Sequence, residues 1–538
     1  MSAGCAGAGI AGSLPLTEEA ELTTAARPAP QAAGGARHDI AWEAVRDLAA
    51  LCGLDMRHFR YPGREADPTS GSHPWVMGCE VVDHFGRMGP GEGPHGADDA
   101  LRERIRTTYR HASWVAHYTA LNAAFLAHAG DRRIPSPLSG GDATILGSVP
   151  IGPYQFTLCL EGERLILAIG IGHMAVGILY PAEALFLVLT PYPLNIRSVL
   201  RVLMDHLLQR PQPWLGWIRR AQAASLRRAY VIGDNRPGHF IRQSLAYLDA
   251  REAEIRAFSA AGGLLLPVPD WCAMDPFTLI PGLAPLERRE VPSEALTLAV
   301  LQDGYDAHRV YRFDIHPDPS WLRHRFAALA PLDHVPALPG RRFRVLISID
   351  AESGRFLNQD EAFRFVLRRL VEACARDDRI LDVAWDGWTV PGAPSPRDLE
   401  ILERIEAVVG RITEGLSGLG EQIRLFGRSA QEKVPAVAEC DLAFVTQGTG
   451  AVIPCWLLKR PTVIYHVASM VQDRSCLDDT VAFNVDQRAV IEMPPEEGRP
   501  VHQRRFSLAP WGLDEAMRRA LAGSLDLGEA ERATLASD

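Results

Sequence analysis

Residues 441–466 read DLAFVTQGTGAVIPCWLLKRPTVIYH, and this stretch decides the fold class. The apolar, β-branched run at 441–447 predicts a buried strand, and the glycines that follow it predict a tight turn. GAVIPCWLLK (450–459) predicts a helix, and PTVIYH (461–466) predicts a second strand. A strand, a helix and a strand in this order form a βαβ unit, which indicates a parallel sheet and an α/β fold.

The same alternation continues upstream. RFRVLISID (342–350), RILDVAWD (379–386) and EQIRLFG (421–427) predict three further strands, each followed by a helical segment. Five strands alternating with four helices predict a doubly wound domain over 341–538.

A second α/β unit precedes this domain. YVIGD (230–234) and LLLPVPD (264–270) predict strands on either side of an amphipathic helix that closes on a glycine pair. We assign this unit to a domain over 141–335, and the proline-bearing linker PLDHVPALPGRR (331–342) separates it from the later series. The chain is thus predicted to hold two Rossmann-like domains.

The beginning of the chain has a different pattern. Residues 1–37 are rich in Ala and Gly and lack a basic region, which predicts a flexible tail rather than a signal peptide. Apolar residues spaced three and four apart predict a helical region over 38–140. Its histidines at 111, 117 and 128 do not share one helical face, so we expect no metal site among them.

The most apolar run, LILAIGIGHMAVGILYPAEALFLVLT (165–190), approaches the length of a membrane span. His173, Pro181 and Glu183 interrupt it, and its β-branched residues and glycines suit short strands. We therefore expect two or three buried strands joined by turns, so that the fold begins with a helical and β-rich N-terminal region.

Composition narrows the classes of protein. The 538 residues carry 56 basic and 66 acidic side chains, a formal net charge of -10, which argues against a nucleic-acid binder. With 47% hydrophobic residues, the chain can bury two or three domain cores. The nine cysteines form no CxxC pair, which is typical of a reducing compartment, so a cytoplasmic location is expected.

The turn after the strand at 441–447 is the clearest candidate site. Ligands of doubly wound sheets bind beyond the carboxyl ends of the strands, where helix N-termini present free N–H groups. Gly448 and Gly450 would allow an anion, such as a diphosphate, to approach the backbone, with Thr449 and Gln447 beside it. The alternative is a tight turn without a ligand, because the stretch is neither a P-loop nor a GxGxxG fingerprint.

Further candidates for the same ligand follow the neighbouring strands. One of the two lysines, Lys433, and nearby Arg428 could meet a phosphate, or could belong to a solvated helix face. Trp388 could stack on a base or sugar, or cover the core. Arg355 and Asn358 offer polar groups, or form a helix cap and its first turn.

Three residues of the earlier unit are candidate bases. His239 lies where strand meets helix, and its near-neutral pKa suits the removal of a proton from a hydroxyl. Capping of its own helix is the alternative role. Asp234 and Asp270 follow the two strands of this unit and could take the same role.

Three segments, in this order and spacing, resemble the family 61 glycosyltransferases, which include bacterial capsular-polysaccharide enzymes. They are GHFIRQSLAYLD (238–249), RFLNQDEAF (355–363) and RSAQEKVPAVAECDLAFVTQGTGAVIPCWL (428–457). The match rests on Gly238-His239-Phe240, on Arg355, Leu357 and Asn358, and on Gly448 and Gly450. Gln447 and Thr449 stand where that family has histidine and alanine in its His-Gly-Ala-Gly turn.

The resemblance implies a GT-B fold, with an acceptor-side domain at 141–335 and a donor-side domain at 341–538. It implies transfer of a sugar from a nucleotide-diphosphate donor to a glycan or glycolipid acceptor in bacterial surface polysaccharide synthesis. No DxD triplet stands where a cation would be needed, so we expect metal-independent chemistry without a cofactor.

Two alternatives stay open: a sugar-nucleotide epimerase of the same architecture, and a non-catalytic scaffold for polysaccharide assembly. The N-terminal part could bind the acceptor or associate peripherally with a membrane. Neither basic clustering nor an amphipathic membrane helix supports the membrane role.

Overall fold

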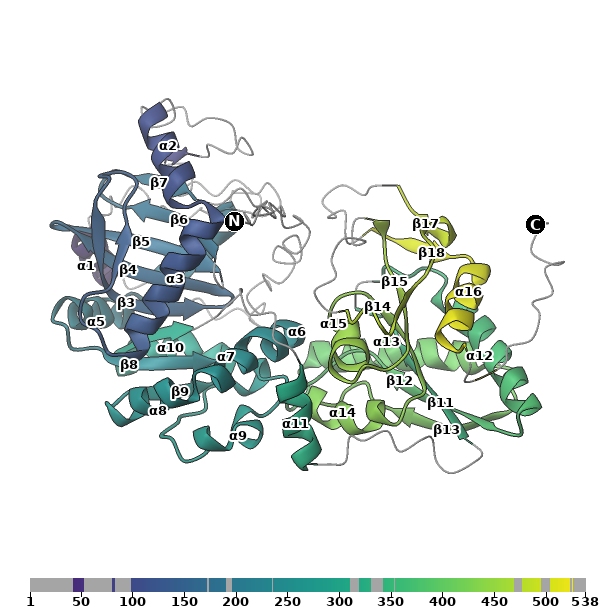
Figure 1. Ribbon diagram of the computed structural model, residues 1–538. Coiled ribbons are helices and arrows are strands. Elements are labelled where there is room, and N and C mark those ends of the chain that lie inside the picture. The colour runs from purple at the N-terminus through teal and green to yellow at the C-terminus, as the bar shows by residue number, and fades with distance from the viewer. Residues whose placement is uncertain are drawn as a thin grey trace, which may run out of the picture.

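A computed structural model describes residues 42–52, 80–82, 98–171, 174–189, 196–234, 236–309, 319–329, 342–352, 354–468, 477–494, 504–522 and 525. The predicted tail at 1–37 and nearly all of the predicted linker lie outside these residues. The described chain is a mixed α/β structure with sheets of seven, three, six and two strands (Figure 1).

The C-terminal half is the doubly wound unit that the alternating pattern predicts. Its six strands all pair in parallel, and their bounds are β11 (Arg342–Ser348), β12 (Ile380–Asp386), β13 (Leu419–Arg424), β14 (Leu442–Thr446), β15 (Thr462–Tyr465) and β16 (Ala482–Asn484). The helices of this unit are α12 (Gln359–Arg376), α13 (Pro396–Thr413), α14 (Ala430–Ala438), α15 (Thr449–Ala451) and α16 (Pro510–Ala520). A small antiparallel pair, β17 (Val490–Glu492) and β18 (Phe506–Leu508), adds to it.

The strand order is β13-β12-β11-β14-β15-β16. This is the 3-2-1-4-5-6 order of a doubly wound sheet, in which successive strands are added in one direction up to the third and in the opposite direction from the fourth. The crevice of this sheet therefore lies between the carboxyl ends of β11 and β14. The short strand β16, which the sequence pattern did not predict, completes the order.

The N-terminal region is built on a seven-stranded sheet. Its strands are β1 (Glu80–Val82), β2 (Arg133–Pro135), β3 (Asp142–Ile151), β4 (Tyr154–Glu161), β5 (Arg164–Ile171), β6 (Met174–Tyr180) and β7 (Leu185–Val188), in the order β1-β7-β6-β5-β4-β3-β2. All neighbours are antiparallel except β1 and β7. The apolar run at 165–190 forms β5, β6 and β7, as expected, and no helix in the described ranges is long and apolar enough to cross a membrane.

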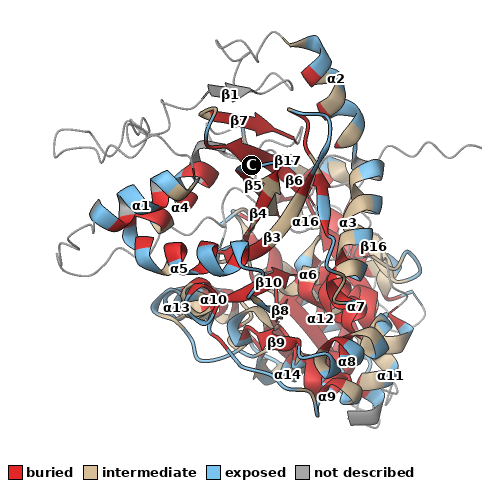
Figure 2. Ribbon diagram, turned by 90° about the vertical axis from the view of Figure 1, so that its left-hand side faces the viewer, coloured by how far each residue is buried: buried red, intermediate tan, exposed pale blue. Residues whose placement is uncertain are grey.

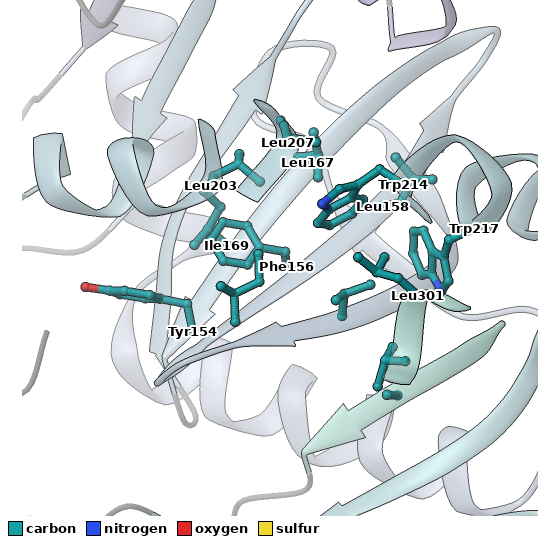
Figure 3. Packing of buried hydrophobic residues seen from close by; sticks show 14 of the residues in the cluster. Tyr154, Phe156, Leu158, Leu167, Ile169, Leu203, Leu207, Trp214, Trp217 and Leu301 are labelled. Atoms are coloured by element: carbon teal, nitrogen blue, oxygen red, sulfur yellow. The ribbon is translucent and has the colours of Figure 1, made fainter. Parts of the chain in front are cut away.

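Helices cover both faces of this sheet. One face carries α1 (Trp42–Cys52), α4 (Ile196–Gln209) and α5 (Pro211–Gln222), and the other carries α2 (Asp99–Thr108) and α3 (His111–Leu126), as Figure 2 shows. The α4–α5 face is filled by large side chains, among them Phe156, Leu167 and Trp214 (Figure 3). Within the predicted helical region, the chain breaks at Arg110 into the separate helices α2 and α3, and α3 ends at Leu126.

A three-stranded parallel sheet follows, in the order β10-β8-β9. Its strands are β8 (Arg227–Ile232), β9 (Leu264–Pro267) and β10 (Tyr305–Arg309), and α10 (Ser293–Asp303) leads into β10. The predicted single helix after β8 is divided into α6 (Pro237–His239), a π-helical turn at 240–244, α7 (Leu245–Ala250) and α8 (Glu252–Ala260). His308 and Arg309 lie in the buried strand β10.

The predicted division of 38–335 does not follow the observed sheets. The strands β3 to β7 fall inside the predicted α/β domain but belong to the antiparallel sheet, so the parallel part of that domain is the sheet β8–β10. Ala44 and Leu48 of α1 share one apolar core with β4, β5 and β8. The helical region is thus a cover of the sheets and has no described core of its own apart from them.

Candidate functional site

The turn after β14 lies at the crevice of the doubly wound sheet. Gly448 has φ +99° and ψ −136°, a conformation that residues with a side chain rarely adopt. A Cβ atom on Gly450 would lie 3.5 Å from Thr446 Oγ1 and 3.9 Å from Ser348 Oγ of β11. The turn therefore connects the two strands that border the crevice, with Thr449 exposed at its tip.

The helix that follows this turn is not a regular α-helix. One turn of α-helix (Thr449–Ala451) passes into a π-helix at Val452–Leu457. Pro454 has no N–H to donate, which is consistent with the shift of the hydrogen-bond ladder. The same passage from a short α-helix into a π-helix occurs in the first α/β unit, where α6 is followed by a π-helix at Phe240–Ser244.

The two strand-to-helix turns meet. A Cβ atom on Gly238 would lie 3.2 Å from Thr449 Oγ1, 3.5 Å from Val452 Cγ2 and 3.6 Å from Thr449 Cα. Figure 1 shows α6 and α15 between the two halves of the molecule. Two motifs more than 200 residues apart in the sequence are thereby brought into one junction.

His239 is held at this junction by two neighbours. Its Nδ1 lies 2.9 Å from Gln243 Oε1, and its Nε2 lies 3.1 Å from Arg236 NH1. Since the guanidinium can only donate, Nε2 accepts and Nδ1–H donates to Gln243. In this arrangement the lone pair of Nε2 faces Arg236.

Asp234 and Asp270 have different surroundings. Asp234 is buried and accepts a 2.8 Å hydrogen bond from the backbone N–H of Arg236, so it orients the loop that carries His239. Asp270 is exposed and accepts hydrogen bonds from Ser293 N, at 2.9 Å, and from Ser293 Oγ. Asp270 therefore caps the start of α10, and none of its described contacts brings it to the junction as the predicted base.

Lys433 is held by contacts within the protein, and its predicted contact with a phosphate stays a prediction. Its buried ammonium lies 2.7 Å from Asp386 Oδ1, 2.8 Å from Thr389 Oγ1 and 3.1 Å from Gly387 O. The contacts with Thr389 and Gly387 are hydrogen bonds, whereas the contact with Asp386 is an ion pair. Lys433 thereby joins α14 to the loop after β12.

Two other predicted ligand contacts are engaged in holding the fold. Asn358 pairs both amide atoms with the backbone of Leu508, at 2.9 and 3.0 Å, and so joins the start of α12 to β18. Trp388 is half-buried and donates its indole N–H to Asp398 at 2.7 Å, which ties the loop after β12 to the start of α13.

Arg355 and Arg428 lie on the loops after β11 and β13. Arg355 Nε is 3.7 Å from Asp350 Oδ2, and the same carboxylate oxygen accepts the backbone N–H of Arg355 at 3.0 Å. Arg428 is exposed, and its carbonyl accepts from Val390 N at 3.2 Å, beside the Trp388 loop. Gln447 is buried directly before Gly448, and its backbone N–H donates to Tyr465 O at 3.2 Å.

Sequence reasoning did not assign roles to Arg236 and Gln243. Arg236 NH2 is buried and has no hydrogen-bond partner among the described residues, two positions before the Gly238–Thr449 contact. The spacing gave a usable signal, because residues three before and four after His239 share its face of a helix. Asp350, whose carboxylate organises the loop after β11, appeared in the sequence only as the last residue of the predicted strand 342–350.

The described residues contain no group of three or more His, Cys, Asp or Glu side chains that could hold a metal ion. The expectation of metal-independent chemistry stays a prediction.

No protein-family model and no curated protein matches this chain. Among solved structures, it is similar to a trehalose-6-phosphate synthase, with 13% identity over 61% of this chain and 69% of that chain and a TM-score of 0.26. A UDP-forming α,α-trehalose-phosphate synthase from Burkholderia vietnamiensis gives 14% identity over 53% and 70% of the two chains, with a TM-score of 0.25. A trehalose-6-phosphate protein from E. coli bound with UDP-2-fluoro glucose gives 13% identity over 61% and 70%, with a TM-score of 0.24. Structural similarity at such low identities and TM-scores does not establish a shared fold.

Proposed function

We propose that this chain is a glycosyltransferase with a GT-B-like arrangement, which transfers a sugar from a nucleotide-diphosphate donor to a glycan or glycolipid acceptor. One observation carries the proposal, namely the contact of Gly238 with Thr449. It sets a candidate acceptor-side histidine against a candidate donor-side turn at the crevice of a doubly wound sheet. Such a crevice is where sheets of this order bind nucleotides.

The roles within the site follow from the side chains that are available there. Backbone N–H groups at 448–450 would meet the leaving diphosphate, and electrostatic stabilisation of that charge is the main catalytic contribution. Arg236 replaces Lys433 as the cation in this scheme, because its NH2 group is buried without a hydrogen-bond partner among the described residues. If a phosphate drew Arg236 away, Nε2 of His239 would become able to accept the proton of the acceptor hydroxyl.

A thermal-shift screen against nucleoside diphosphates and nucleotide sugars, with and without Mg²⁺, tests the donor site. A ligand that binds only the native state stabilises it by about 2.7 kcal/mol at a hundredfold excess over Kd. We expect a shift with one base family that does not depend on Mg²⁺. Gly450→Val should abolish it, because the added side chain would fill the turn, whereas Gly410→Val on the exposed face of α13 should not change it.

Transfer assays with the donor identified by the screen then test the histidine. His239→Ala should lower kcat by about 10² to 10⁴ while leaving the donor-induced thermal shift in place. If Gly450→Val and His239→Ala both left transfer intact, the assignment of these roles would be wrong. Release of an isomerised donor without an acceptor would identify an epimerase, and no nucleotide binding at all would favour the scaffold.

A further inference from the structure

A cavity lies in the N-terminal region, between α3 and the face of the seven-stranded sheet opposite to α4 and α5. Its volume is about 60 Å³, it is partly open to solvent, and its lining is mainly apolar. A mainly apolar lining with a few polar groups is typical of sites for small molecules. None of its lining residues belongs to the junction of α6 and α15, so a ligand in this cavity would bind independently of the proposed function.

The cavity arises from an asymmetry of the sheet. Alternate residues of β4 and β5, such as Phe156 and Leu167, fill the α4–α5 face with large side chains (Figure 3). On the opposite face several residues of β3 to β6 are small, and Ser148, Thr157, Ala168, Gly170 and Ala175 line the cavity together with Ile145 and Ile178. Since successive side chains of a strand point to opposite faces, these small residues form the floor beneath α3.

Helix α3 supplies the opposite wall. Trp114, Tyr118 and Leu121 line the cavity from this helix, and Tyr109 lines it from the residue after α2. Large aromatic side chains over a floor of small residues leave a space that protein atoms do not fill. Close packing is the rule in protein interiors, so a space of this kind points to a ligand.

Two buried polar side chains of the lining have unused hydrogen-bonding atoms. Arg132 is 6% exposed; its NH2 group contacts Asp306, and its Nε–H has no partner among the described residues. His308 is 8% exposed; its Nε2 lies 2.8 Å from Asn122 Oδ1, and its Nδ1 has no partner among the described residues. Both side chains lie against the ring of Phe125, with Arg132 Cζ 5.3 Å and the His308 ring 5.0 Å from its centroid.

These two atoms have opposite character. Burial, assisted by the charge of Arg132, lowers the pKa of His308 to about 3, so its ring is neutral at physiological pH. With Nε2–H donating to the Asn122 oxygen, Nδ1 is an acceptor, whereas Arg132 Nε–H is a donor. A hydroxyl group both accepts and donates. A carboxylate ligand is excluded for two reasons. It has no hydrogen to donate to Nδ1, and the charge of Arg132 is already balanced by Asp306.

We propose that this cavity binds an apolar molecule that carries a hydroxyl group, with the hydroxyl at the end formed by Arg132 and His308. The apolar part would lie between the aromatic wall of α3 and the floor of small residues. The hydroxyl oxygen would accept from Arg132 Nε–H, and its hydrogen would be donated to His308 Nδ1. Both buried polar atoms would then be satisfied, as buried polar groups normally are.

A pair of matched ligands tests the proposal on the full chain. 1-Hexanol and 1-methoxypentane have the same number of heavy atoms and suit a small cavity, but only the alcohol can donate to His308. Isothermal titration calorimetry should show that the alcohol binds and that the ether binds at least about tenfold more weakly, because a buried acceptor is then left unpaired. Absence of binding by either ligand would overturn the proposal. Equal affinities for the alcohol and the ether would also overturn the proposal, because water and not the ligand's hydroxyl would then satisfy the two polar atoms.

Two variants locate the ligand. His308→Phe removes the acceptor and should bring the affinities for the two ligands within about threefold of each other. Ala168→Leu raises the floor and should abolish binding of both ligands, whereas Ala407→Leu, an identical change at an exposed position of α13, should leave both affinities unchanged. Retention of alcohol binding by a folded Ala168→Leu variant would place the ligand elsewhere and refute the site.

Discussion

At the scale of single residues, the two lysines of the chain show how environment decides the role of a charge. Lys433 is buried in the first turn of α14 and surrounded by three acceptors, whereas Lys459 is 42% exposed and lies 3.0 Å from Asp478. Sequence made Lys433 a candidate ligand contact because lysine is rare in this chain. Its partners from the loop after β12 are more than 40 residues away, and no local pattern indicates them.

We expect Lys433→Met to lower the free energy of unfolding by about 3–5 kcal/mol, because it leaves the Asp386 carboxylate without its buried partner. Lys459→Met is the matched control and should cost about 1 kcal/mol or less, since its ion pair is solvated. Urea denaturation measures both. Equal losses in the two variants would contradict the structural role of Lys433.

At the scale of elements, α13 and α14 begin with the same device. Ser395 and Ser429 are N-caps, and the residue three positions later, Asp398 or Glu432, returns a hydrogen bond to the cap. Asp398 has one contact more than Glu432, because it also accepts the indole N–H of Trp388. The start of α13 therefore holds the loop after β12, whereas the start of α14 is a cap alone.

This difference predicts unequal effects of equivalent substitutions. Glu432→Ala removes a capping-box partner and should cost about 1 kcal/mol of stability. Asp398→Ala removes the same contacts and also leaves the Trp388 N–H unpaired, so its cost should be larger by about 1–3 kcal/mol. Chemical denaturation followed by tryptophan fluorescence compares the two variants. A larger loss in Glu432→Ala would show that the Trp388 hydrogen bond contributes nothing.

At the scale of the whole molecule, the two α/β units share an apolar core. Tyr230 and Phe240 of the first unit belong to the same buried cluster as Val434, Trp456 and Leu346 of the second. Asp275 N also donates to Gln431 Oε1 at 2.9 Å across the junction. An interface that is continuous with both cores resists the independent motion that is usual between domains.

We therefore expect the full chain to unfold in one cooperative transition that includes both α/β units. A fragment of residues 342–538 should bind a hydrophobic dye and aggregate, because it exposes its half of the shared core. Differential scanning calorimetry of the chain and dye fluorescence of the fragment are the measurements. A fragment that unfolds cooperatively at the temperature of the full chain would contradict a shared core.

The sequence alone determined the elements of the second α/β unit, because each buried strand is a short apolar run and each helix has a start signal of its own, such as Ser395 before α13. It also indicated that residues 165–190 are strands. These features depend on neighbours within a few residues of each other. The π-helical turns and the breaks at Arg110 and Arg251 were not predicted, because packing and hydrogen-bond shifts decide them.

Only the tertiary structure decided which candidates share a site. The sheet order sets β14 beside β11, and the junction sets Gly238 against Thr449, whereas Asp270 and Lys433 are used in other contacts. The sequence did not indicate the cavity beneath α3 either, since the small residues of its floor come from four strands. Contacts between residues so distant in the chain depend on sheet pairing and core packing, which no local pattern of amino acids specifies.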